Sequence, residues 1–245
     1  MSSIRHRGNQ GFFYYGIPIH APPGVHDGAF EKLGRHVKPP ATILEMGAGS
    51  GAFTRRMVDA GFQVEAVDHD PPEAWPLANV PLHRQDLNSE TWSLPAARYD
   101  AAVAIEVVEH LENPTLFFRN VRRLLKPGGI VLFTTPNIMS VDSRRKMLLK
   151  GELAFFGKGT LFDIGHMSPL PFWLLEDILV KERYQIVERF FVGRLGIFVR
   201  AGRALWKVAI VPWIDLALFA LGWGIPAAAA FRTNLGIVAR PAGDS

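Results

Sequence analysis

The sequence predicts an α/β fold built on a parallel sheet of seven strands. Short apolar runs alternate with helix-like stretches over most of the 245 residues, which is typical of βαβ units. The first clear strand also runs directly into a glycine-rich turn. Apolar residues make up 48% of the chain and charged residues 20%, a balance that excludes a disordered or low-complexity protein.

Each predicted strand is a short run of apolar residues bounded by polar or turn residues. The strands are expected near 42–46, 63–67, 81–84, 99–105, 130–135, 184–192 and 235–239. Helices are expected near 51–60, 114–125 and 170–181. The second of these helices meets Lys126-Pro127-Gly128-Gly129, which predicts a helix stop followed by a turn.

The chain is expected to form a single domain of residues 1–245. Its parts are an N-terminal arm (1–40), a core (41–192), an apolar insertion (193–233) and the last strand (234–240). The insertion contains Leu216–Phe231, which holds no charged residue but is shorter than the roughly 20 residues that cross a bilayer. We therefore expect either an interfacial apolar element or a helical lid packed on the core.

The net charge of +4 comes from one segment, since residues 181–207 hold seven basic and two acidic groups. Next to an apolar tract, this segment favours contact with an anionic membrane surface through 181–231, or an anionic substrate, over DNA binding. A solvated face is the alternative. The start of the chain shows no apolar signal segment, so we expect a cytoplasmic protein, peripheral on the inner face of the membrane if the segment binds lipid. No motif predicts an oligomeric state.

The composition also limits the chemistry. The chain has no cysteine, which excludes a disulfide scaffold, a zinc site built on thiolates and a cysteine nucleophile.

The sharpest motif is the strand and turn Ile43-Leu44-Glu45-Met46-Gly47-Ala48-Gly49-Ser50-Gly51. Glycines at such a turn let the backbone approach a ligand closely. With Ala52 the run also satisfies the dinucleotide pattern G-x-G-x-x-A. The residue that discriminates is Glu45, because a carboxylate before the turn repels a pyrophosphate but suits an ammonium group.

Two further carboxylates end predicted strands. Asp68 follows the second strand, where a carboxylate can accept both hydroxyls of a ribose. Asp86 ends the third strand, at a place suited to an adenine amino group. An ordinary loop aspartate is the alternative for each.

Together with the segment Tyr99 to His110 and Leu125-Lys126-Pro127-Gly128-Gly129, these residues resemble the class I S-adenosylmethionine-dependent methyltransferases. The resemblance covers about residues 40–192 and the terminal strand. It implies a Rossmann-like sheet of seven strands, the last antiparallel, with S-adenosylmethionine over the ends of the first four strands. It also implies contacts to this methyl donor from one set of residues: Glu45, Gly47, Ala48, Gly49, Gly51, Asp68, His69, Asp86, Leu87, Ile105 and Glu106.

A second group of polar residues lies after the predicted strand 99–105. Glu106, Glu109 and His110, with His166 later in the chain, form a set suited to a divalent cation. Their spacing resembles that of the ubiquinone-biosynthesis O-methyltransferases and the Hen-type small-RNA 2′-O-methyltransferases, where it implies a metal that engages acceptor hydroxyls. Magnesium, manganese and zinc are the candidate ions.

Two alternatives apply to this group. In a metal-free site, Glu109, His110 or His166 would act in acid–base catalysis. In a structural role, Glu109 and His110 would cap the helix near Pro114, and His166 would cap the helix near Pro169.

The sequence therefore favours O-methylation of a small, lipid-linked or saccharide acceptor. RNA 2′-O-methylation is an alternative acceptor within the same class. A nicotinamide-dependent oxidoreductase and a non-catalytic S-adenosylmethionine-binding module are the alternatives from other classes; Glu45 and Lys126–Gly129 argue against the first, and the intact set of cofactor residues against the second.

Overall fold

The computed structural model describes residues 4–6, 12–195 and 232–243. A three-stranded sheet comes first, formed by β1 (Ile4–His6), β2 (Phe12–Tyr14) and β3 (Ile17–Ile19). The main sheet contains seven strands: β4 (Thr42–Met46), β5 (Gln63–Asp68), β6 (Leu82–Arg84), β7 (Tyr99–Ile105), β8 (Leu125–Pro136), β9 (Tyr184–Leu195) and β10 (Arg232–Pro241). The helices are α1 (Val25–His36), α2 (Ala52–Asp59), α3 (Pro114–Leu124), α4 (Val141–Lys150), α5 (Thr160–Ile164) and α6 (Phe172–Lys181), with a short 3₁₀ helix, η1, at Val108–His110.

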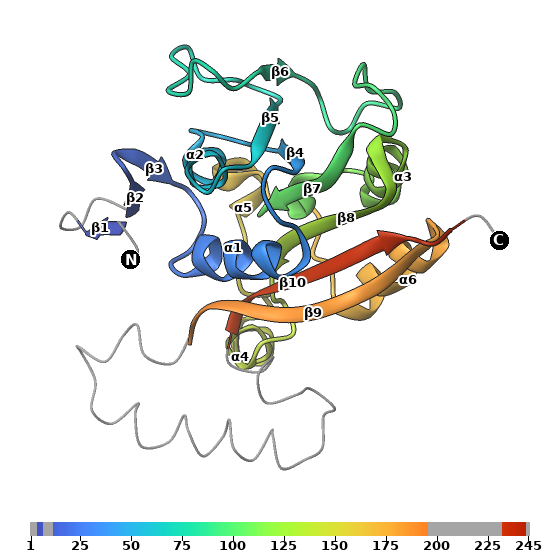
Figure 1. Cartoon of the computed structure of the whole chain (residues 1–245). Coiled ribbons are helices and arrows are strands. Elements are labelled where there is room, and N and C mark those ends of the chain that lie inside the picture. The colour runs from blue at the N-terminus through green and yellow to red at the C-terminus, as the bar shows by residue number, and fades with distance from the viewer. Residues whose placement is uncertain (1–3, 7–11, 196–231, 244–245) are drawn as a thin grey trace.

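The strand order of the main sheet is β6-β5-β4-β7-β8-β10-β9 (Figure 1). The first five strands in this order are parallel, whereas β10 runs antiparallel to both β8 and β9. Each predicted strand is confirmed, and so is the antiparallel last strand. The order reverses between β4 and β7, so the loops that follow these two strands flank the position where open α/β sheets bind ligands.

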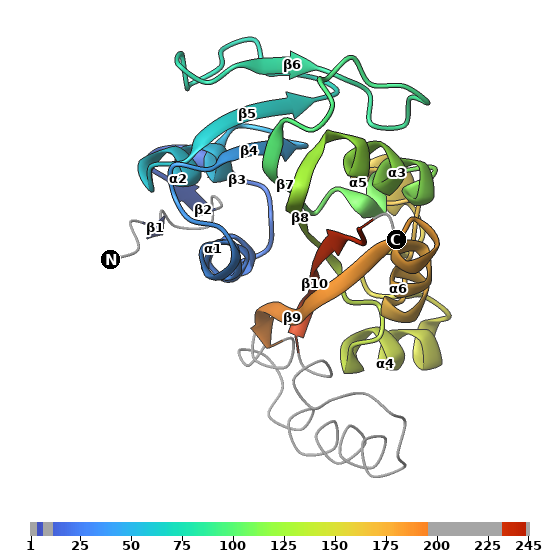
Figure 2. The ribbon, with the colours of Figure 1, turned by 45° about the vertical axis from the view of Figure 1, so that its right-hand side comes forward.

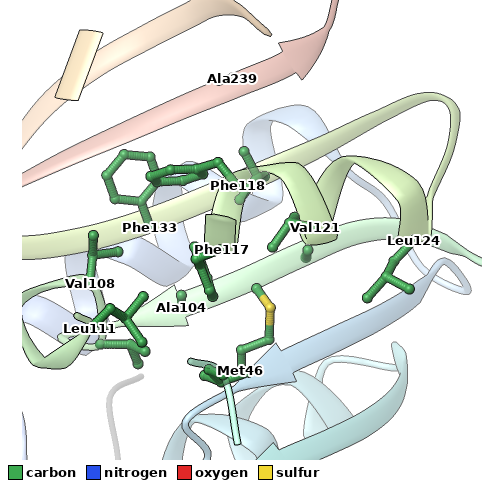
Figure 3. Packing of buried hydrophobic residues seen from close by; sticks show 14 of the residues in the cluster. Met46, Ala104, Val108, Leu111, Phe117, Phe118, Val121, Leu124, Phe133 and Ala239 are labelled. Carbon is green, nitrogen blue, oxygen red and sulfur yellow. The ribbon is translucent and has the colours of Figure 1, made fainter. Parts of the chain in front are cut away.

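Helices cover both faces of this sheet, as Figure 2 shows. α1 and α2 pack on one face through Leu33, Phe53 and Met57, against strand residues such as Ile43 and Val103. α3 and α6 cover the other face, where Phe117, Phe118, Val121 and Leu124 of α3 contact Met46, Ala104, Phe133 and Ala239 (Figure 3). Both surfaces of the central strands are therefore buried, which explains their nearly continuous apolar sequences.

One predicted turn is wrong. α3 ends at Leu124 as expected, but Lys126–Gly129 forms the irregular first part of β8, not a separate turn. The register with β7 shifts between Tyr99 and Ala101, and Gly129 packs so closely on the carbonyls of Tyr99 and Asp100 that a side chain would not fit without movement. Pairing with β7 therefore draws these residues into the sheet as a bulge.

Three helices were not predicted: α1, α4 and α5. The two helices predicted as 51–60 and 170–181 are confirmed as α2 and α6. β9 reaches Leu195 and β10 begins at Arg232, so the ends of the predicted insertion 193–233 belong to strands. The rest of that insertion, including Leu216–Phe231 and most of the basic segment, lies outside the described residues. No helix in the described part of the chain is long and apolar enough to cross a membrane.

Candidate functional site

The glycine turn after β4 has the backbone conformation that its sequence predicts. Gly47, Gly49 and Gly51 have φ angles of 71°, 53° and 86°, a region that favours glycine. A Cβ on Gly47 would lie 2.4 Å from Cγ2 of Val107, so the turn also lies tightly against the segment after β7. The N–H groups of Gly47 and Ala48 donate to the carbonyl of Val67, which fixes the turn beside the end of β5.

Glu45 is buried beneath this turn. Its carboxylate accepts a hydrogen bond from the Thr54 hydroxyl on the first part of α2. Burial raises the pKa of Glu45 to about 8. A buried carboxyl group with one donor is protonated near neutral pH, and a cationic group close to it would favour its ionised form. The contact of Glu45 with an ammonium group stays a prediction.

Asp68 joins the end of β5 to the glycine turn. One carboxylate oxygen, Oδ2, accepts the N–H of Gly49 at 2.7 Å, and Oδ1 accepts the N–H of Asp70 at 3.0 Å. Each carboxylate oxygen can accept a second hydrogen bond, so Asp68 can hold the turn and bind a pair of ligand hydroxyls at once. His69, the next residue, is exposed.

The predicted adenine contacts lie after β6. Asp86 is exposed, and its Oδ1 accepts the N–H of Asn88 at 2.9 Å, which shapes the loop. Leu87 is buried in the same apolar cluster as Trp92. At the end of β7, the side chain of Ile105 is buried in the cluster on the opposite face. These residues lie along the ends of neighbouring strands, in the order in which the resemblance places them.

Glu106 follows β7 directly and is held from two other strands. Its φ angle is 57°, in the left-handed region that non-glycine residues adopt only at an energetic cost. The Thr134 hydroxyl donates to Oε1 at 2.7 Å, and the Asn234 side-chain amide donates to Oε2. Burial raises the pKa of Glu106 to about 7. The two donors lie on β8 and β10, so this carboxyl group is fixed across three strands.

A second acidic residue, Glu109, lies in η1 and is fully buried. Its Oε2 accepts the Thr135 hydroxyl at 3.0 Å, whereas Oε1 has no hydrogen-bond partner among the residues that the structure describes. Burial, followed by the charge of Glu106, raises the pKa of Glu109 well above its usual range. An unsatisfied buried carboxylate oxygen is costly, which indicates a site prepared for a proton or a cation.

His110 and His166 lie beside Glu109. The backbone carbonyl of Glu109 accepts the N–H groups of Met167 and Ser168, both at 3.0 Å, and this brings the segment before α6 back to η1. The two imidazole rings meet edge to face with their centres 4.7 Å apart. One ligand atom each from Glu109, His110 and His166 lie within 4.8 Å of one another.

Both imidazoles favour the neutral form. Burial, and for His110 also the neighbouring His166, lowers the pKa of each ring. His166 Nδ1 lies 2.9 Å from the Phe155 carbonyl, which fixes the tautomer with hydrogen on Nδ1 and leaves the lone pair on Nε2. A neutral imidazole oriented in this way can bind a metal or accept a proton.

The capping alternatives for this group are wrong. Asn113 is the N-cap of α3, and its side chain accepts the N–H of Leu116. α6 begins at Phe172, several residues after His166. Glu106, predicted as a fourth metal ligand, is not among the three residues that the fold brings together. Its carboxylate is instead bonded to Thr134 and Asn234.

Sequence reasoning missed the residues that hold these side chains. Thr54, Thr134, Thr135, Asn234 and the carbonyl of Phe155 carry no motif of their own. Thr54 could have been found, because it lies in the first turn of the helix that follows the glycine motif. The others are 11 to 128 residues away from their partners; the sheet pairing brings Thr134, Thr135 and Asn234 close, and the segment between α4 and α6 brings Phe155 to His166.

Comparison with known proteins identifies the family. A sequence family described as a methyltransferase domain matches residues 27–170, more than half of the chain. The ubiquinone biosynthesis O-methyltransferase of Caulobacter vibrioides is 31% identical over 107 residues, which cover 39% of this chain and 41% of that protein. The enzyme of the same name from Xanthomonas axonopodis pv. citri is 31% identical over 135 residues, covering 49% and 52%. The chain therefore spans about half or less of the length of these curated relatives.

Solved structures agree with the fold. A methyltransferase from Archaeoglobus fulgidus superposes with a TM-score of 0.60 at 16% identity, over 87% of this chain and 93% of that one. The 1,6-didemethyltoxoflavin-N1-methyltransferase of Burkholderia thailandensis, solved with S-adenosylhomocysteine bound, gives 0.59 at 18% identity, over 89% and 78%. The family match contradicts the nicotinamide-dependent oxidoreductase alternative. The chain belongs to the methyltransferase domain family and contains a class I S-adenosylmethionine-dependent methyltransferase domain.

Proposed function

We propose that this methyltransferase transfers the methyl group to an oxygen atom of a small, lipid-linked or saccharide acceptor, at a divalent cation held by Glu109, His110 and His166. The observation that carries the proposal is the convergence of three ligand atoms within 4.8 Å, one from each residue. The names of the curated relatives, which are O-methyltransferases, support oxygen as the accepting atom.

The residues present fit a cation. Glu109 supplies a buried carboxylate whose Oε1 has no partner in the described part of the chain. His166 is fixed by Phe155 so that Nε2 offers its lone pair, as metal-binding imidazoles are usually fixed by a carbonyl on the other nitrogen. Two imidazoles and one carboxylate suit manganese or zinc better than magnesium, which prefers oxygen ligands.

Methyl transfer places a specific demand on this site. The acceptor oxygen attacks the methyl carbon in line with the carbon–sulfur bond, that bond breaks with its electron pair on sulfur, and S-adenosylhomocysteine leaves. The hydroxyl proton must go to a base. A bound cation would supply Lewis-acid stabilisation of the acceptor hydroxyl oxygen. The protein residues would orient that hydroxyl and exclude water from its neighbourhood.

The metal-free alternative uses the same residues. Because the pKa of His110 and of His166 is lowered, both rings are neutral at pH 7 and each can accept a proton. In that case His110 or His166 is the general base, and Glu109 stays protonated in its buried position.

Calorimetric titration of the chelator-treated protein with manganese and zinc distinguishes the two. We expect one site per chain, lost in His166→Ala and in Glu109→Gln but retained in His69→Ala, which removes an exposed imidazole outside the cluster. Elemental analysis of the untreated protein gives a second measurement. If neither ion binds at micromolar concentration, the acid–base alternative replaces the metal proposal.

An apolar or lipid-linked acceptor is supported by exposed apolar side chains in the segments that precede and follow His166. Nine of the eleven exposed large apolar side chains among the described residues lie between Met147 and Val180. Phe162 on α5 is 90% exposed, and Leu149 at the end of α4 is 74% exposed. The chain that joins these helices also carries the Phe155 carbonyl that fixes His166. Exposed apolar surface of this kind is characteristic of a binding site for an apolar partner.

Cosedimentation with vesicles tests the lipid proposal, including the contact expected through 181–231. We expect binding to phosphatidylglycerol vesicles that weakens with salt, because Lys and Arg attract anionic headgroups. Phe162→Ser and the replacement of 205–231 by a short Gly/Ser hairpin each test one region. If the unaltered protein stays in the supernatant at low salt, the membrane contact through 181–231 is wrong and the acceptor need not be lipid-linked.

A further inference from the structure

The N-terminal hairpin β2–β3 packs on α2, the helix that follows the glycine turn. Tyr14 and Ile17 are buried in the same apolar cluster as Phe53. The Arg56 guanidinium lies 4.9 Å from the centre of the Tyr14 ring, and the Tyr14 hydroxyl donates to Asp59. These contacts fix the hairpin through residues of α2 alone, without any residue of the glycine turn 47–51.

His20 follows β3 directly and lies on the glycine turn. Its Nε2 is 2.9 Å from the Ser50 hydroxyl oxygen, and its Cδ2 is 3.6 Å from the position of a Cβ built on Gly49. The ring is exposed, and Nδ1 makes no hydrogen bond with any of the described residues. The hairpin therefore places an imidazole with a free nitrogen at the surface of the turn.

The geometry of the strand ends determines which part of the methyl donor lies here. Asp68, at the end of β5, suits the ribose hydroxyls, and the acid–imidazole cluster follows β7. The sulfonium must lie between these two sites, above β4. Because the glycine turn follows β4, the amino-acid part of the donor, which is attached to the sulfur, lies over this turn.

The charges around the turn distinguish the two ends of that amino acid. Glu45 and Asp68 are carboxyl groups on the side of β4 and β5, and they favour the ammonium end. On the other side, α2 begins at Ala52 with no side chain capping its first N–H groups. Helix N-termini favour anions. With the Ser50 hydroxyl donating to Nε2 of His20, the Nδ1–H group of His20 adds one side-chain donor beside this helix terminus.

We propose that His20 binds the α-carboxylate of S-adenosylmethionine, with Ser50 orienting the imidazole ring. The assignment depends only on the methyl donor and is independent of the acceptor and of the metal. It makes the N-terminal hairpin part of the donor site.

S-adenosylmethionine and its decarboxylated form test this assignment, because they differ only in the carboxylate. In calorimetric titration we expect His20→Ala to weaken S-adenosylmethionine binding about tenfold, the contribution of one charge-assisted hydrogen bond. Affinity for the decarboxylated form should not change. His20→Gln, which keeps a donor, should restore part of the loss, and Ser50→Ala should produce a smaller loss of the same selectivity.

His83→Ala is the matched control. His83 lies on β6, and its imidazole also contacts one side chain, that of Glu65 on β5, which is outside the glycine turn. It should leave both affinities unchanged. Equal weakening of both ligands by His20→Ala would overturn the proposal and assign His20 a general role in shaping the site. Unchanged binding of both ligands would overturn it as well.

Discussion

The two halves of the site are constructed differently. The donor half, at the ends of β4, β5 and β6, is formed by backbone turns whose polar groups bond within one turn, as Asp86 does to Asn88, or to the end of the next strand, as Gly49 does to Asp68. The acceptor half, after β7, consists of side chains from distant segments, and one buried oxygen of Glu109 has no partner in the described residues. The first half is determined by local geometry, and the second by tertiary packing around an unsatisfied group.

The largest expected effect tests whether the donor half depends on backbone geometry. Gly47→Ala should lower the free energy of unfolding by about 3 kcal/mol, because it adds both left-handed strain and the contact with Val107. Gly151→Ala is the control, since Gly151 has nearly the same φ angle, 68° against 71°, with no atom near its Cβ position. It should cost only about 1 kcal/mol.

Chemical denaturation measures both variants. The difference between them is the cost of the Val107 contact, and a double variant with Val107→Ala should be less destabilised than the two single changes add up to. Equal destabilisation by Gly47→Ala and Gly151→Ala would show that the close approach to Val107 is unimportant.

A smaller effect is expected at Asp68, where one carboxylate serves both the turn and the ligand. Asp68→Ala should weaken binding of S-adenosylhomocysteine by roughly 1–3 kcal/mol, as the loss of a charged acceptor does. Asp68→Asn keeps an oxygen for the Gly49 N–H and should lose less. Calorimetric titration distinguishes these values. Should Asp68→Ala bind the ligand with unchanged affinity, the ribose would be bound elsewhere.

The pH dependence of stability gives the smallest effect. The pKa of Glu45 is raised from 4.5 to about 8 in the folded protein, so its contribution to stability is present below pH 4.5 and is lost as the pH rises through 8. Glu45→Gln should therefore reduce the fall in unfolding free energy between pH 5.5 and 6.5 by about 1 kcal/mol, since each pH unit between the two pKa values contributes about that much. Thermal unfolding across this range measures it, with the exposed Glu90→Gln as control. An unaltered slope in Glu45→Gln would mean that Glu45 is ionised in the folded protein.

These two halves also differ in how far the sequence predicts them. The strands and the glycine turn could be located because apolar periodicity and glycine are local signals, and the structure places them at the expected residues. Glu109, His110 and His166 could be grouped by their ligand chemistry and by a resemblance in spacing, but no local pattern places His166 beside the other two. The position of Glu106 could not be predicted, because Asn234, which bonds it, is 128 residues away on β10.

The N-terminal segment also depends on long-range contacts that the sequence does not predict. The strands β2 and β3 have three residues each, too short for a periodic pattern, and their position depends on the packing of Tyr14 against Arg56. The contact of His20 with Ser50 follows from that packing, and no spacing in the sequence indicates it.

The position of β10 between β8 and β9 has a consequence for folding during synthesis. β8 and β9 are translated first, and the edge of β8 that β10 will occupy stays unpaired until residues 232–241 leave the ribosome. That edge belongs to a strand with buried, apolar Ile130–Phe133. The unpaired N–H and C=O groups of the unfinished sheet can therefore pair with strands of other chains. The Asn234 amide that fixes Glu106 arrives with the same strand. A nascent chain interrupted before residue 232 would therefore be both aggregation-prone and catalytically incomplete.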